Sequence, residues 1–183
     1  VFIRAEGGGR LDMPLVSSMN AASGGNSSIE VRASGAGSRI DLPELRSFID
    51  VSSGSLDAGL PWSPSALYSR LEALSEGIVS LGNVKTVQGV YVPLNASSTI
   101  NLTTIEALTY SLIDINRAAD FGLMVNATGT TFNVNGHSVN LSLLSQVAGT
   151  NIYVSGSVET VLPSVRSLLN DQGHMAWQVS GAG

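Results

Sequence analysis

The chain has 183 residues, no cysteine and a net charge of −5, with Lys85 as its single lysine. The lack of cysteine excludes disulfides and thiolate chemistry. Because an acidic chain with so few cations cannot neutralise a phosphate backbone, we expect no nucleic-acid partner. No apolar run approaches the roughly 18 residues of a membrane-spanning helix, so we expect no membrane insertion.

An apolar motif is written twice near the start of the chain. Residues 11–19 read Leu-Asp-Met-Pro-Leu-Val-Ser-Ser-Met, and residues 40–48 read Ile-Asp-Leu-Pro-Glu-Leu-Arg-Ser-Phe. The lead-ins match as well, because residues 3–7 and 31–35 both read apolar-Arg-Ala-x-Gly. Self-similarity at a period of roughly 20 to 50 residues is the mark of a repeat fold, in which similar units stack on one another.

The apolar skeleton of the second copy recurs further along the chain. That skeleton is Ile40, Leu42, Leu45 and Phe48. We identify a degraded copy, two good copies and a near copy, in chain order: Ala66, Tyr68, Leu71 and Leu74; Ile100, Leu102, Ile105 and Leu108; Val139, Leu141, Leu144 and Val147; Leu162, Val165 and Leu168. With the first copy, this makes about six units separated by loops of different length. The polar stretch 116–120 is interpreted as one such loop.

Short alternating runs accompany the units and predict half-buried strands. They lie at 29–31, 132–134, 152–154 and 175–177. Glycines at positions 7, 35, 136 and 156 follow strand-like runs closely, where a tight corner needs a positive φ. Each unit is therefore expected to consist of two or three short strands joined by bends.

These patterns predict an all-β chain: a β-solenoid (β-helix) of about six coils, forming one domain over residues 1–183. Both ends read as interrupted repeats, so we expect a segment of a longer array that associates end to end with itself. Two alternatives stay open. The Leu-x-x-Leu spacing also suits short helices at 65–75 and 104–115, as in a leucine-rich solenoid, and the strand pattern also suits a non-solenoid β-sandwich.

The Leu-Pro-x-Leu-x-Ser unit of residues 42–47, with the Ile-x-Val-x-x-x-Gly run of residues 29–35 ahead of it, resembles the tandem β-solenoid repeats of large secreted bacterial surface proteins. The resemblance implies an extracellular or cell-surface location and a non-enzymatic structural or adhesive role, as a stalk, adhesin or filament subunit. The alternative is a carbohydrate-binding or polysaccharide-degrading β-helix domain.

The sequence offers little that indicates catalysis. His137 and His174 lie in turn-like contexts without a second ligand at metal-binding spacing, so no metal or other cofactor is expected. Asp12 and Asp41 occupy equivalent positions, with Arg10 and Arg39 two residues earlier, which predicts a mutually neutralising surface ladder. We expect no catalytic pair among the dispersed acids, which include Glu44, Asp50 and Asp57.

Two kinds of candidate surface site remain. Sequons for glycosylation occur at Asn26, Asn95, Asn101, Asn126 and Asn140. Trp62, between two prolines in Leu-Pro-Trp-Ser-Pro, is the candidate aromatic for contact with a carbohydrate, although packing over a loop suits it as well. The expected partners are the chain itself and a surface polysaccharide.

Overall fold

The computed structural model describes residues 1–21, 27–51, 69–97, 99–168 and 175–181. In this part of the chain all regular structure is β, and every strand pairs in parallel with its neighbours. The all-β expectation is confirmed. The helical alternative is wrong, because 104–115 contains two strands and the described part of 65–75 contains another. The described residues contain no helix with the length and hydrophobicity needed to span a membrane.

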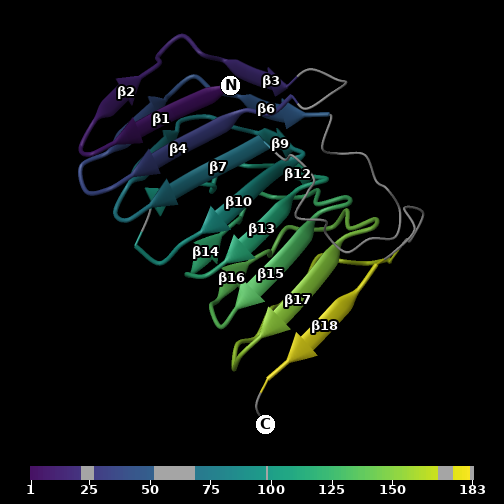
Figure 1. Ribbon diagram of the computed structural model, residues 1–183. Coiled ribbons are helices and arrows are strands. Elements are labelled where there is room, and N and C mark those ends of the chain that lie inside the picture. Colours follow the sequence, from purple (N-terminus) through teal and green to yellow (C-terminus); the bar gives the residue numbers. More distant parts are fainter. Residues whose placement is uncertain (22–26, 52–68, 98, 169–174, 182–183) are drawn as a thin grey trace.

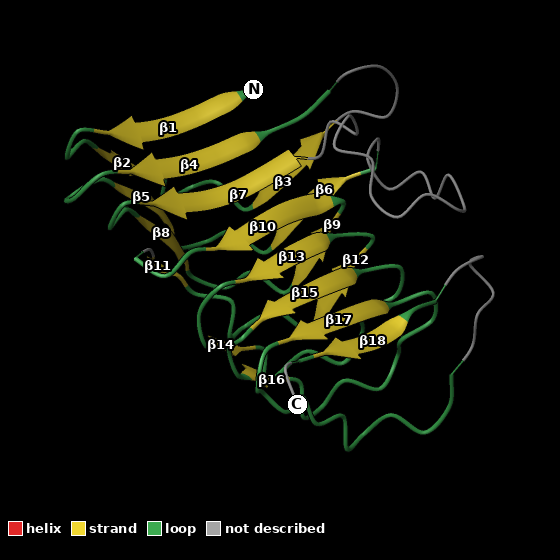
Figure 2. Ribbon diagram, turned by 60° about the horizontal axis from the view of Figure 1, so that its bottom comes forward, coloured by secondary structure: helices red, strands yellow, loops and turns green. Residues whose placement is uncertain are grey.

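One eight-stranded sheet, called here the long sheet, runs the length of the molecule (Figures 1 and 2). Its strands in spatial order are β1 (Phe2–Glu6), β4 (Glu30–Ser34), β7 (Ser69–Leu74), β10 (Val90–Leu94), β13 (Leu112–Ile115), β15 (Thr131–Asn135), β17 (Asn151–Ser155) and β18 (Trp177–Ser180). Spatial order follows chain order. The chain therefore returns to this sheet repeatedly, each time beside the strand it formed before.

Three smaller sheets take up the chain between these returns. The second sheet contains β2 (Arg10–Asp12), β5 (Arg39–Leu42), β8 (Ile78–Leu81) and β11 (Thr99–Ile100). The third sheet contains β3 (Ser18–Ala21), β6 (Ser47–Asp50), β9 (Thr86–Gln88) and β12 (Ala107–Thr109). A two-stranded sheet joins β14 (Ala119–Asp120) and β16 (Val139–Asn140). The result is a parallel-β, repeat-like structure compatible with a β-helix.

The core is built from side chains that alternate along each strand and align between strands. In the long sheet, Val31 pairs with Leu71, Ile113 with Phe132, and Phe132 with Ile152, and all five side chains are buried. In-register pairing places each inward side chain against its equivalent in the next strand, because the side-chain period of a strand is two. The apolar residues thus form columns that run along the stack.

The strand register shows where the repeats lie and corrects the assignment of one copy. Ile40 and Leu42 of β5 pair with Val79 and Leu81 of β8. The third copy of the skeleton is therefore Val79, Leu81, Val84 and Val87, all buried. Its assignment to Ala66, Tyr68, Leu71 and Leu74 is wrong. Leu71 belongs to the long sheet, while Ala66 and Tyr68 lie outside the described residues. Valine stands at the positions of Ile40, Leu45 and Phe48 in the true copy, which hides it from a search for Leu-x-x-Leu.

A further repeat was missed, and the polar stretch 116–120 is more than a loop. It contains β14, whose Ala119 pairs with Val139 of a recognised copy. Phe121, Met124 and Ala127 then continue the skeleton, and all three are fully buried. Phe121 packs edge-on against Phe132, with ring centroids 6.2 Å apart. The aliphatic skeleton does not identify this unit, because Ala, Phe and Met replace the aliphatic residues of the other copies. From Leu81 onward the anchor therefore recurs about every 20 residues.

Two kinds of corner connect the sheets. Glycines at positions 7, 35, 136 and 156 have φ between 60° and 93°, as expected for tight corners after the long-sheet strands. At the other corner, just before those strands, a column of buried hydroxyls accompanies positive-φ glycines at positions 89, 129 and 149. Ser111 Oγ accepts a hydrogen bond from the Val90 amide, and Thr130 Oγ1 accepts one from the Ser111 amide. These hydroxyls satisfy amides that the turn would leave unpaired in the core.

Candidate functional site

The outward face of the long sheet changes character along the molecule. Its first strands carry ion pairs. Arg4 Nε contacts Glu30 at 2.7 Å, and Glu72 contacts Arg70 Nη2 at 2.7 Å and Arg32 Nε at 3.7 Å. Glu72 is almost fully buried beneath these neighbours. The charges at this end neutralise one another, so this part of the face offers little net charge to a ligand.

A hydrogen bond between Tyr91 and Asp114 lies between the charged part of this face and the uncharged part that follows. The Arg70 guanidinium lies over the Tyr91 ring, 4.9 Å from its centroid. The Tyr91 hydroxyl donates a hydrogen bond to Asp114 Oδ2 at 2.5 Å. Desolvation of the half-buried phenol, together with this hydrogen bond, raises the pKa of Tyr91 above its usual range. Tyr91 therefore stays protonated and serves as a donor, which makes it unsuitable as a general base near neutral pH.

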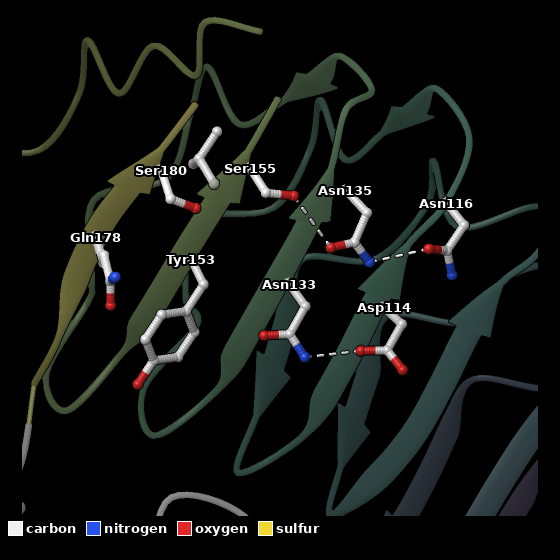
Figure 3. Close-up of a pocket in the computed structure, with 9 residues that line it drawn as sticks. Asp114, Asn116, Asn133, Asn135, Tyr153, Ser155, Gln178 and Ser180 are labelled. Carbon is white, nitrogen blue, oxygen red and sulfur yellow. Dashed lines mark hydrogen bonds between the residues drawn. The ribbon is translucent and has the colours of Figure 1, made fainter. Parts of the chain in front are cut away.

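Beyond Asp114, the outward side chains are mostly uncharged amides and hydroxyls in two rows (Figure 3). Register sets the first row, because Asp114 pairs with Asn133, Asn133 with Tyr153, and Tyr153 with Gln178. Within it, Asn133 Nδ2 donates to Asp114 Oδ1 at 2.7 Å. The second row lies two residues further along each strand and begins with Asn116.

The second row is also cross-linked. Asn135 Nδ2 donates to Asn116 Oδ1 at 2.9 Å, and Ser155 Oγ approaches Asn135 Oδ1 at 3.5 Å. Side chains at equivalent positions of adjacent strands can form hydrogen bonds with each other because the strands lie about 4.8 Å apart. The ladder holds the amide planes in fixed orientations before any ligand arrives.

These two rows surround an open depression of about 350 Å³, called here the polar hollow. It is lined by Asp114, Asn116, Asn133, Asn135, Tyr153, Val154, Ser155, Gln178 and Ser180. Asp114 is the one charged residue in this lining, and its two oxygens already accept hydrogen bonds from Tyr91 and Asn133. Among the described residues, the Tyr153 hydroxyl and the Gln178 side chain have no hydrogen-bond partner. The hollow therefore offers free donors and acceptors without a strong charge.

The predicted acid–base ladder lies elsewhere, on the second sheet. Arg10 pairs with Arg39 and Asp12 with Asp41, so the predicted equivalence is confirmed. The Arg39 Nε donates to both oxygens of Asp41 at 2.8 and 2.6 Å, and this bond lowers the pKa of Asp41. The described residues contain no group of three or more His, Asp or Glu side chains that could hold a metal ion.

The sequons that fall in the described residues occupy turns and edges. Asn101 Oδ1 accepts hydrogen bonds from the amide and hydroxyl of Thr103, and Asn126 does the same with Thr128. Asn140 Nδ2 donates to Asp120 Oδ1, and Asn95 Nδ2 donates to Ala73 O at 3.4 Å. Asn101 and Asn140 are exposed, whereas Asn95 and Asn126 are half-buried.

The remaining predicted candidates do not come together. His137 is exposed in its turn, as expected. Asn26, Asp57, Trp62 and His174 lie outside the described residues. None of the predicted candidate residues belongs to the polar hollow.

Sequence reasoning missed the hollow, although part of its signal was visible. Two of the recognised strand runs, Phe132-Asn133-Val134 and Ile152-Tyr153-Val154, place a polar residue between two apolar ones. Alternation alone predicts that Asn133 and Tyr153 point outward. Their adjacency could have been found by aligning the runs on their apolar residues. Comparisons of the chain with protein-family models, with curated proteins and with solved structures found no match.

Proposed function

We propose that this chain is a β-solenoid segment of an extracellular protein and that its role is structural or adhesive rather than enzymatic. The observation that carries the proposal is the unbroken parallel register of the long sheet from β1 to β18. In such a stack each repeat contacts only its neighbours, so the body is stiff and can be lengthened by adding repeats. A spacer or stalk requires these properties.

The state of the carboxylates supports a non-enzymatic role. Glycan cleavage requires an acid and a base that are free to face the substrate. Four carboxylates are held in ion pairs by a neighbouring basic side chain: Glu30 by Arg4, Asp41 by Arg39, Glu72 by Arg70 and Glu106 by Lys85. Asp114 accepts hydrogen bonds from Tyr91 and Asn133. These contacts hold the carboxylates in place and occupy their oxygens, so they are not free to face a substrate.

We also propose that the outer edges of β1 and β18 pair with a neighbouring segment, either of the same protein or of a second copy. Each edge carries a row of backbone groups that a parallel strand can bind. Apolar side chains accompany these edges, since Phe2 is 71% and Val179 is 77% exposed. Sedimentation velocity over a concentration series tests pairing between copies, and a single monomeric species at all concentrations would contradict it.

Two measurements test the structural, extracellular role. Antibodies against the chain should label intact, unpermeabilised cells that produce it, and labelling only after permeabilisation would refute the location. The purified chain should release no product from neutral or uronate polysaccharides. Reproducible product release that disappears in Asp114→Asn would refute the non-enzymatic role.

A further inference from the structure

We propose that the polar hollow on the long sheet binds a neutral, polyhydroxylated chain, that is, an uncharged polysaccharide or oligosaccharide. The hollow spans β13, β15, β17 and β18, so its groups repeat across neighbouring strands (Figure 3). A ligand that contacts several of these groups must lie across the strands, along the axis of the stack. A polymer with a short, regular repeat suits this geometry.

The hydrogen-bonding groups of the hollow match hydroxyl groups. A side-chain amide offers two N–H donors and one oxygen acceptor, and a sugar hydroxyl both donates and accepts. Asn133 uses one N–H on Asp114 and keeps its oxygen free to accept. Gln178 keeps its whole amide free within the described part of the chain. The cross-strand ladder holds the amides of Asn133 and Asn135 in place, which reduces the entropy lost on binding.

Tyr153 supplies the apolar component of the site. Its ring lies in the first row, between Asn133 and Gln178, and the residue is half-buried (Figure 3). Aromatic side chains that combine a broad apolar face with a polar tip are frequent in binding sites, because each contributes both kinds of contact. The ring can pack against the C–H face of a sugar while its hydroxyl bonds to the ligand.

Charge and sheet geometry argue against other ligands. No Lys or Arg lines the hollow, and Asp114 contributes a negative charge. An anionic polymer would therefore meet repulsion and find no cationic partner. An extended peptide binds a sheet through an unpaired strand edge. Three of the four described strands that carry the hollow, β13, β15 and β17, have partners on both sides, and only the fourth, β18, ends the sheet. The hollow also lacks the apolar pocket that a peptide side chain would need as an anchor.

Affinity electrophoresis of the full 183-residue chain in gels containing soluble polysaccharides tests the proposal. The neutral probes are mixed-linkage β-glucan, xyloglucan, galactomannan and dextran, and the anionic probes are polygalacturonate and alginate. At least one neutral polymer should retard the protein, and the anionic polymers should not. The Kd from the concentration dependence is then compared among variants.

Tyr153→Ala should weaken binding by about tenfold or more, whereas Tyr153→Phe, which keeps the ring, should lose less. Gln178→Ala should also weaken binding. Gln146→Ala, an exposed glutamine outside the hollow, is the matched control and should leave the Kd unchanged. Because Tyr153 and Gln178 point outward, these variants should fold, and circular dichroism checks this.

Three outcomes would overturn the proposal: no retardation by any neutral polymer, tighter binding of an anionic one, or equal affinities for Gln178→Ala and Gln146→Ala. None of them bears on the proposed structural role, which is tested by product release and cell labelling.

Discussion

The buried hydroxyl column at the corner before the long sheet should be essential for stability, and Thr130→Val tests it. Thr130 is fully buried. Its Oγ1 donates to Leu108 O at 2.7 Å and accepts from the Ser111 amide at 3.3 Å. Valine has nearly the same shape and suits a strand-rich region. The substitution therefore removes two hydrogen bonds while leaving the packing almost unchanged.

The expected cost follows from the groups left behind. The Ser111 amide loses its acceptor inside the core, and leaving a buried donor unsatisfied costs about 1–3 kcal/mol. The additional methyl group of valine recovers up to roughly 0.8 kcal/mol by apolar burial. We therefore expect a net loss of about 1–3 kcal/mol, because Leu108 O loses a partner as well. In a chain of this size, that lowers the melting temperature by roughly 2 to 12 °C.

Urea unfolding followed by circular dichroism measures the change, with Thr131→Val as the control. Thr131 is the next residue and also a threonine, but it faces outward on β15 and its hydroxyl only accepts a 3.3 Å bond from Asn151 Nδ2. The control should stay within about 0.5 kcal/mol of the wild type. If Thr130→Val is as stable as the control, the hydroxyl column does not stabilise the fold and the reasoning is wrong.

Three further predictions follow from the core, a close backbone contact and the buried phenol. Leu42→Asp should destabilise the chain by at least about 3 kcal/mol, because it places an unpaired charge in a fully buried column; an unchanged urea midpoint would contradict the assigned core. Gly82→Ala should also lower the melting temperature, since an added Cβ would lie 2.0 Å from Pro43 O. In the control Gly136→Ala the added Cβ meets open space, so stability should fall only because alanine is strained at a positive φ. Equal effects of the two substitutions on the melting temperature would disprove the close contact at Gly82. The raised pKa of Tyr91 means that the folded state favours the neutral phenol, so its contribution to stability is complete below the unfolded pKa of about 10 and is lost as pH rises further. Stability should therefore fall less steeply above about pH 10 in Tyr91→Phe, as measured by urea unfolding, and identical slopes would be evidence against the assigned environment.

The sequence alone determined the class of the fold and much of its core. The spacing of Ile40, Leu42, Leu45 and Phe48 requires one face of each unit to be apolar, and repetition of that spacing requires the faces to meet. The two central skeleton positions of three copies are buried as the spacing predicts: Leu42, Leu45, Leu102, Ile105, Leu141 and Leu144. Leu162 and Val165 are partly buried and pack against the same core. Corner glycines were also predictable, because few other residues tolerate their positive φ.

The tertiary structure alone decided the register and the composition of the outward face. The Val79 unit and the Phe121 unit fill the same columns with different residue types, because a column selects for volume and apolarity rather than for leucine. Once the strands are paired, residues about 20 positions apart become neighbours across one strand spacing. Asp114, Asn133, Tyr153 and Gln178 form a row for this reason. Aligning the strand runs places Asn133 beside Tyr153, but no local pattern adds Asp114 and Gln178 to the row, since the lengths of the intervening turns determine which outward residues meet.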